Sequence, residues 1–252
     1  LSSFGGRMSR ACNMGAATST GLTSERPPAV VLGDLTLVRL LGMAGIPVIL
    51  ATSDPHDEAR RSRHVGGACE LPGFEEPHRA ASAEILFDLG ATLHRRLGRK
   101  VPLIYGSDGH LDLLYEHRGD LAEHYLFTLN HEPLARALHD KERFYQLAQT
   151  AGIRVPRTCQ SGRGLAQAMA EMRGPFLVKP RRKGDWSGIQ RSLFDGRGKA
   201  RVFPTREALL AHPAFARLEN ELIVQEHIES DVSGLVSFHA FADERGEILA
   251  SF

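Results

Sequence analysis

The chain has 252 residues, of which 42% are hydrophobic and 24% are charged, with 31 basic and 30 acidic side chains. This composition supports a packed core and excludes a wholly disordered, collagen-like or disulfide-rich protein. The formal net charge of +1 gives no general attraction to nucleic acid or to an anionic membrane, so we expect neither as a partner. Cys12, Cys69 and Cys159 are an odd and widely spaced set, which predicts reduced thiols and a cytoplasmic protein.

The first 27 residues are small, polar and aperiodic, and they lack the apolar segment of a signal peptide. We therefore expect a disordered leader over 1–27. The most apolar stretch, 29–51, contains Asp34, Arg39 and three glycines, which is too interrupted for a membrane-spanning helix. The chain begins with Leu and stops at Phe252 in a strand-like run, so we expect a fragment of a longer protein.

Strands and helices alternate in the first half of the chain. Apolar, β-branched runs predict strands, helical spacing of apolar residues predicts helices, and glycines separate them. In chain order, we expect a strand over 27–34, a helix over 35–44, a strand from 46, a helix over 80–97 and a strand over 101–105. A strand–helix–strand unit implies a parallel sheet. We therefore predict an α/β domain with an open parallel sheet over 28–130.

The pattern changes after residue 130. The helical stretch 134–151 contains Asp140, which reads as an N-cap, so we predict a short helix and a second one that starts at Lys141. Beyond Gly152, which ends that helix, we expect an extended piece, a helix over 164–173, a strand over 175–180, a helix over 207–216, a strand over 221–228 and a terminal hairpin. These elements predict a mixed α+β domain over 131–252.

The first strand–helix turn does not fit a dinucleotide. Such a turn needs Gly-x-Gly-x-x-Gly so that the backbone can approach a pyrophosphate. The chain has the single Gly33 there, followed by the acidic Asp34. This disfavours NAD or FAD binding and, with it, a nicotinamide-dependent oxidoreductase.

A basic segment with interspersed glycines occupies 175–201, which contains eight basic residues, two acidic residues and four glycines. A flexible loop with backbone N–H groups and cations suits a polyphosphate, although a solvated loop tip has the same composition. Lys179 is more informative. A lysine inside an apolar strand must either extend to solvent or meet an anion.

Two other segments place polar groups where a ligand would use them. Lys141 follows Asp140 at a helix start, where the macrodipole disfavours a cation; an anionic ligand explains it, and so does a plain surface lysine. The strand 221–228 changes abruptly from apolar residues to the polar end 225–228. That end could form hydrogen bonds with a flat heterocycle, although an ordinary strand end without a ligand has the same pattern.

The order and spacing of these segments are specific. Lys179 lies 38 residues after Lys141, and Glu226 lies 47 residues after Lys179. This series resembles the ATP-grasp superfamily, through LHDKERFYQLAQTAGIRVPRT, GPFLVKP and LIVQEHIES. The N-terminal AVVLGDLTLVRLLGMAGIPVILATSDP, with SRHV and LIYGSD, resembles the Rossmann-like pre-domain of carboxylate–amine ligases of the D-aspartate ligase-like or carbamoyl-phosphate-synthase-like type. The resemblance covers 28–252 and implies an ATP-grasp domain that is incomplete at its C-terminus.

The resemblance implies roles for the matching residues. Lys141 and Lys179 match the two lysines that bind the ATP phosphates. The loop after Lys179 matches the flap that closes over the triphosphate, where the candidate contacts are Lys183, Ser187 and Gly188.

Residues 225–228 match the hinge that holds adenine, and they are Gln225, Glu226, His227 and Ile228. Glu226 would meet the exocyclic amine, and the backbone near Ile228 would meet a ring nitrogen. Asp231 is a weaker candidate for the ribose hydroxyls.

The implied reaction is an ATP-dependent ligation, in which a carboxylate is activated as an acyl phosphate and an amine displaces the phosphate. It needs ATP and Mg²⁺, and the metal carboxylates of the superfamily belong to a strand beyond residue 252. We therefore assign no metal ligand and no catalytic residue, and we expect the chain alone to bind ATP weakly without turning it over. The alternative is a non-catalytic or regulatory ATP-binding module of the same fold.

Histidines recur every seven residues, at His110, His117, His124 and His131. On one helix, successive members would lie about 10 Å apart. Ligands of a single metal ion lie about 2 Å from it, and Gly119 interrupts the helix. We expect surface or capping histidines and no metal site.

Overall fold

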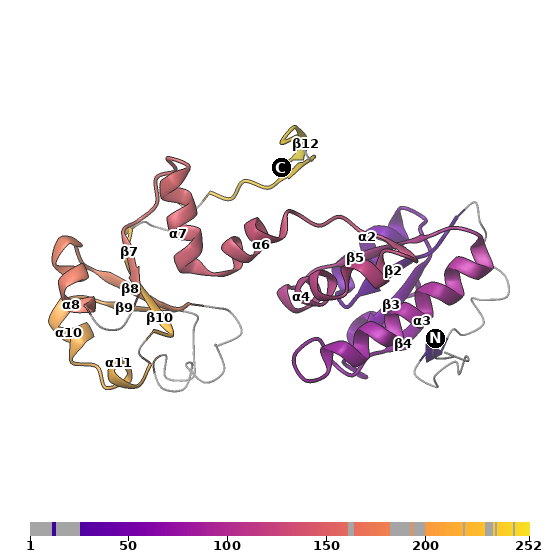
Figure 1. Cartoon of the computed structure of the whole chain (residues 1–252), viewed down its shortest axis with the longest axis horizontal. Helices are drawn as coiled ribbons and strands as arrows, with labels where there is room; N and C mark the ends of the chain where they lie inside the picture. The colour runs from indigo at the N-terminus through magenta and orange to yellow at the C-terminus, as the bar shows by residue number, and fades with distance from the viewer. Residues whose placement is uncertain are drawn as a thin grey trace. The chain divides into compact units, whose positions relative to one another are not determined.

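The structure is a computed structural model that describes residues 12–13, 26–160, 164–181, 193, 200–218, 220–229, 234, 236–243 and 245–252. The chain divides into two compact units, Leu1–Glu132 (unit 1) and Pro133–Phe252 (unit 2). Figure 1 shows the course of the chain through both. Within the described ranges, no helix is long and apolar enough to cross a bilayer.

Unit 1 is built on a six-stranded sheet with the order β1-β4-β3-β2-β5-β6. The strands are β1 (Cys12–Asn13), β2 (Ala29–Leu32), β3 (Val48–Thr52), β4 (Val65–Glu70), β5 (Val101–Tyr105) and β6 (Tyr125–Leu126). All pairings are parallel except that of β1 with β4. The first parallel strand, β2, stands at the centre and the chain extends the sheet to both sides, as in a doubly wound fold. The predicted parallel α/β sheet is confirmed.

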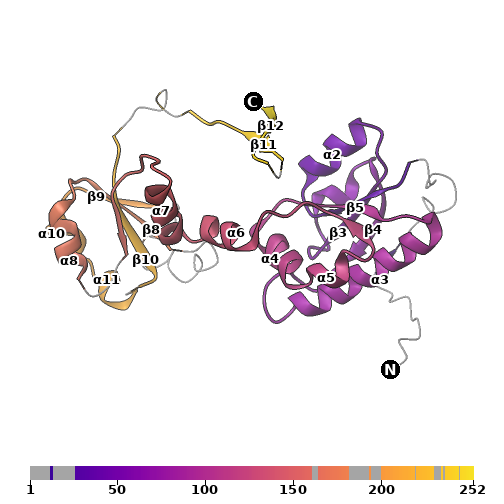
Figure 2. The same ribbon diagram turned by 45° about the horizontal axis from the view of Figure 1, so that its top comes forward.

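Helices cover both faces of this sheet, which is why β2 and β3 are buried throughout. The helices are α2 (Leu35–Met43), the 3₁₀ helix η1 (Glu58–Arg61), α3 (Arg79–Leu97), α4 (Asp108–Glu116) and α5 (Arg118–Leu121). Alternate residues of β2 point to opposite sides: Val30 joins a core with α3, α4 and α5, whereas Val31 joins a core with α2 and η1. Figure 2 shows α2 and α3 on opposite faces.

Unit 2 contains a four-stranded antiparallel sheet with the order β7-β10-β8-β9. Its strands are β7 (Thr158–Gln160), β8 (Phe176–Pro180), β9 (Arg201–Phe203) and β10 (Leu222–Glu226). The helices are α6 (Glu132–His139), which begins at the last residue of unit 1, α7 (Lys141–Thr150), α8 (Leu165–Ala168), the 3₁₀ helix η2 (Met169–Glu171), α10 (Arg206–Leu210) and α11 (Ala214–Arg217). The predicted start of a helix at Lys141 is confirmed.

One face of the unit 2 sheet is apolar. Phe176 and Val178 of β8 and Val224 of β10 pack in a core with residues of α8, η2, α10 and α11. Because side chains alternate along a strand, Leu177 and Lys179 of β8 lie on the other face. This second face carries the polar groups described below.

A terminal hairpin, β11 (Ala240–Ala242) with β12 (Ile248–Ser251), forms a separate two-stranded sheet, as the sequence predicts. All side chains of the two strands are exposed. Phe241 is 56% exposed and Leu249 is 63% exposed.

Three expectations differ from the structure. Cys12–Asn13, inside the predicted disordered leader, form strand β1, with Cys12 opposite Cys69; most of the remaining leader lies outside the described residues. Cys69 is in a disulfide, so the prediction of three reduced thiols is wrong there. Cys159 is free, and burial raises its pKa to about 11.

The single helix predicted over 207–216 is two helices, because Pro213 has no N–H to continue the first.

Candidate functional site

Lys179 occupies the polar face of the central strand β8. It is half-buried, and its Nζ donates a hydrogen bond to Gln225 Oε1 of the neighbouring strand β10 at 3.0 Å. An ammonium has three N–H donors. Among the described residues this is the single hydrogen bond of Lys179, so two donors have no protein partner there. The strand lysine therefore meets a neutral amide, and not a carboxylate.

The amide of Gln225 is held in one orientation by a second strand. Gln225 Nε2 donates to Thr158 Oγ1 of β7 at 2.9 Å, and Thr158 Oγ1 in turn donates to Pro156 O at 3.0 Å. This chain of bonds turns the amide oxygen toward Lys179. A row of polar groups thus crosses three strands of the sheet, and it ends at an ammonium.

The environment of Lys179 favours an anionic ligand. Partial burial lowers the pKa of Lys179, and the positive charge of Lys141 lowers it further. The two cations are therefore close enough to repel one another, although they come from different elements. A bound anion would relieve both effects, since it would supply the missing counter-charge and accept the remaining N–H groups.

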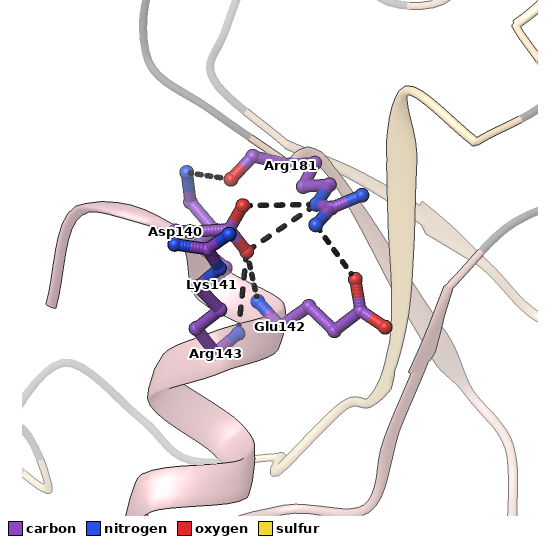
Figure 3. A network of polar contacts seen from close by, with 5 residues as sticks. All are labelled: Asp140, Lys141, Glu142, Arg143 and Arg181. Carbon is purple, nitrogen blue, oxygen red and sulfur yellow. Dashed lines mark hydrogen bonds and ion pairs between the residues drawn. The ribbon is translucent and has the colours of Figure 1, made fainter. Parts of the chain in front are cut away.

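The start of α7 brings Lys141 to this face. Asp140 is its N-cap, and its carboxylate accepts hydrogen bonds from Glu142 N at 3.1 Å and Arg143 N at 3.2 Å. Lys141 Nζ donates to Arg181 O, just after β8, at 3.4 Å. Figure 3 shows how Arg181 reaches Asp140 and Glu142 from the strand side. The predicted cap is confirmed, and the helix start lies against β8.

The hinge segment is divided between the two faces. Glu226 lies on the face opposite Gln225, where its Oε1 accepts from Arg173 N at 2.8 Å. The backbone N–H groups of Glu226 and His227 donate to Arg157 O and Pro175 O, both at 2.9 Å. Beyond them, Ile228 N–H has no partner among the described residues, and its side chain is 68% exposed. His227 Nδ1 is buried without a hydrogen-bond partner in the described part of the chain.

Comparison with known proteins shows which of them resemble this chain in sequence and in fold. D-aspartate ligase from Enterococcus faecium is 25% identical over 186 residues, which are 71% of this chain and 43% of that protein. The N5-carboxyaminoimidazole ribonucleotide synthetase structure from Thermus thermophilus matches with a TM-score of 0.60 at 18% identity, and it covers 89% of this chain and 52% of that one. The fold of the chain is a Rossmann-like α/β domain followed by part of an ATP-grasp domain, as in this structure.

A third similar protein has a structure that contains a nucleotide. The Staphylococcus aureus N5-carboxyaminoimidazole synthetase, complexed with ADP, matches with a TM-score of 0.57 at 14% identity over 86% of this chain and 51% of that one. No family model matches the chain. The chain spans about half the length of these relatives.

Within this ATP-grasp fold, the structure brings together Lys141, Lys179 and Gln225, but it directs the Glu226 side chain to the opposite face. The predicted contacts Lys183, Ser187, Gly188 and Asp231 lie outside the described residues.

Sequence reasoning missed Arg181 and Thr158. Thr158 carries no local signal. Arg181 carries none either, because its partner Asp140 lies 41 positions earlier in the chain.

The described residues contain no group of three His, Cys, Asp or Glu side chains that could hold a metal ion. The spaced histidines have separate surroundings. The expectation of a surface or capping histidine is wrong for His110, which is buried beside Phe74, and Gly119 lies inside α5 and does not interrupt it. His124 Nδ1 lies 3.2 Å from His94 Nδ1.

Proposed function

We propose that the chain binds ATP on the polar face of the unit 2 sheet, as the nucleotide-binding part of an ATP-dependent carboxylate–amine ligase. The observation that carries this proposal is the position of Lys179, which is half-buried, near Lys141 and short of hydrogen-bond acceptors among the described residues. In such a ligase, ATP supplies the phosphoryl group that activates a carboxylate, and an amine then attacks the activated carbon.

The two lysines would bind the phosphates. Ammonium groups neutralise phosphate charge and donate charge-assisted hydrogen bonds, and phosphoryl transfer depends mainly on such positioning. Gln225 would orient Lys179 and would not itself contact the base, because its amide is already engaged on both sides. Lys183, Ser187 and Gly188 stay proposed contacts of the triphosphate.

The segment after β10 would hold adenine. Ile228 N–H would donate to a ring nitrogen, since the N–H groups of Glu226 and His227 are engaged with the protein. Glu226, as placed here, would support the hinge through Arg173 instead of meeting the exocyclic amine. Asp231 stays a proposed contact of the ribose.

We further propose that residues 28–130 form the pre-ATP-grasp domain and residues 131–252 the incomplete ATP-grasp domain. The division of the chain at Glu132 and Pro133 supports these bounds. The residues that the structure describes do not fit a Mg²⁺ site of their own, because no three acidic, histidine or cysteine side chains among them are grouped so that they could hold a metal ion. We therefore assign no Mg²⁺ ligand and derive no step through the metal.

Calorimetric titration with ADP tests the proposal. We expect Lys179→Ala to weaken ADP binding at least about tenfold, because a charge-assisted contact to phosphate is lost. Lys100→Ala is the matched control; Lys100 lies in unit 1, where its Nζ donates to Ala122 O, and ADP affinity should not change. Equal ADP affinity of the wild type and Lys179→Ala would refute the site.

Phosphate release from ATP and Mg²⁺ tests whether the chain carries a complete catalytic site. We expect the 252-residue chain to bind nucleotide and to release no phosphate above the enzyme-free blank. Phosphate release that is abolished in Lys179→Ala would contradict this expectation and would show that the chain carries a complete catalytic site.

A further inference from the structure

Arg181 connects the strand of one phosphate-binding lysine to the helix of the other. It follows β8 directly, and its guanidinium contacts two carboxylates at the start of α7 (Figure 3). Arg181 Nε lies 3.0 Å from Asp140 Oδ2, and a terminal nitrogen lies 3.0 Å from Glu142 Oε2. The side chains of Arg181, Asp140 and Glu142 are 24%, 5% and 27% exposed, so the contacts are largely withdrawn from water.

The main chain of Arg181 holds the same helix start. Its carbonyl oxygen accepts from the backbone N–H of Lys141 at 3.3 Å and from Lys141 Nζ at 3.4 Å. Its own N–H donates to Glu221 O at 2.8 Å, next to β10. Both the backbone and the ammonium of Lys141 are therefore fixed relative to the sheet that carries Lys179.

The charges explain why an arginine is needed. Asp140 and Glu142 flank Lys141 in sequence, and both are acidic. Without Arg181 the two carboxylates would lose their guanidinium partner in a partly desolvated place, which is costly although Asp140 keeps its cap hydrogen bonds. Lys141 would then be drawn to them, and their negative charge would oppose a phosphate at the same place.

We propose that Arg181 is a positioning residue for phosphate binding, which neutralises Asp140 and Glu142 and anchors Lys141 so that both lysines act on the nucleotide. The inference rests on the proposed function, that is, on ATP binding in unit 2. A guanidinium suits this task because its planar fork can serve two carboxylates at once, whereas an ammonium is a point charge.

Calorimetric titration of the full chain with ADP and with adenosine tests this role. A positioning defect at the phosphates should affect ADP only, whereas general damage to the unit would affect both ligands. We expect Arg181→Ala to weaken ADP binding about tenfold or more and to change adenosine binding less than about twofold. Arg181→Lys should fall between Arg181→Ala and the wild type.

Removal of an unpaired carboxylate should rescue binding. In Arg181→Ala/Glu142→Gln, we expect about half of the loss on the logarithmic scale to be recovered, since one repelling charge is gone. Arg154→Ala is the control, because Arg154 is an exposed arginine of unit 2 outside the candidate site; it should bind both ligands normally. If Arg181→Ala fails to fold, Arg181→Lys and its combination with Glu142→Gln provide the same comparison.

Two results would overturn the role of Arg181: equal weakening of ADP and adenosine binding, or unchanged ADP affinity in Arg181→Ala. In either case, if Lys179→Ala weakens ADP binding as expected, the proposed ATP site in unit 2 is still supported. A wild-type chain that does not bind ADP would refute both.

Discussion

His110 shows what burial does to a single titratable side chain in unit 1. It lies in α4 and is 8% exposed; its Nδ1 accepts from Gly106 N at 3.4 Å, and its ring packs against Phe74 with centroids 4.1 Å apart. Burial lowers its pKa to about 4, although the charge of Asp34 acts in the opposite direction. The histidine is therefore neutral in the folded chain at neutral pH.

This shift predicts that unit 1 loses stability in mild acid. Above about pH 6.5 the folded and unfolded chains both hold a neutral His110, and its contribution is complete. As the pH falls from about 6.5 to about 4, the unfolded chain takes up a proton that the folded chain refuses, so up to about 3 kcal/mol is lost. His110→Gln should lose about 2 kcal/mol less than the wild type between pH 7 and pH 5.

Urea unfolding at the two pH values, followed by tyrosine fluorescence, measures this difference, because Tyr105, Tyr115 and Tyr125 lie in unit 1 and only Tyr145 lies in unit 2. Other groups titrate in both proteins and cancel in the comparison. The same pH dependence in the wild type and His110→Gln would show that His110 is not responsible.

At the scale of elements, Gly90 explains how α3 packs against β6. A Cβ at Gly90 would lie 2.5 Å from Tyr125 Cε2 and 2.8 Å from Cζ. Tyr125 is 2% exposed, and its hydroxyl donates to Leu86 O of the same helix at 2.7 Å. The tyrosine thus fills the space that the glycine leaves, and neither side can move without losing buried contacts.

We therefore expect Gly90→Ala to destabilise unit 1 by about 1–3 kcal/mol, although alanine favours a helix. Gly119→Ala is the matched control. Gly119 lies in α5, and a Cβ there would meet nothing within 4 Å, so the change should be neutral or stabilising by up to about 1 kcal/mol. Urea unfolding of both variants tests the prediction, and equal stabilities would refute the steric role of Tyr125.

The sequence indicates most elements but not their partners. The helix over 79–97 and the strands β2, β5, β8 and β10 are predicted because periodicity, caps and β-branched runs are local signals. β4 was not predicted, since VGGACE has few β-branched residues and gains its strand structure from β3 and β1. The disulfide at Cys69 likewise depends on a contact that spacing alone does not show, whereas the break at Pro213 follows from a local signal that the helical pattern over 207–216 concealed.

In the candidate site, too, local sequence signals identify some residues, and tertiary contacts determine the rest. Lys141 and Lys179 were predicted from a helix cap, an apolar strand and the order of the segments. The contact of Arg181 with Asp140 joins residues 41 positions apart, and the alternation that turns Glu226 away from Gln225 depends on the strand register. Local pattern therefore finds the charged groups, whereas tertiary structure decides which of them share a face.

At the scale of the whole molecule, the two units have separate hydrophobic cores. Buried side chains of β2, β3, β5 and α3 belong to the cores of unit 1, and those of β8, β9 and β10 belong to the core of unit 2. The described residues of the candidate site, among them Lys141, Lys179 and Gln225, all belong to unit 2. A bound nucleotide should therefore stabilise the core of unit 2 and not the cores of unit 1.

Hydrogen exchange of the full chain with and without ADP tests this separation. A ligand at 100 times its Kd stabilises the state that binds it by about 2.7 kcal/mol. We expect slower exchange at the amides of β8 and β10, which open only when the site is lost, and unchanged exchange at those of β2 and β5. At the same ADP concentration, Lys179→Ala should reduce the effect to about 1.4 kcal/mol if its binding is tenfold weaker, and further if the loss is larger. Equal protection of β2 and β8 by ADP would contradict the separation, because it would show that nucleotide binding stabilises both cores together.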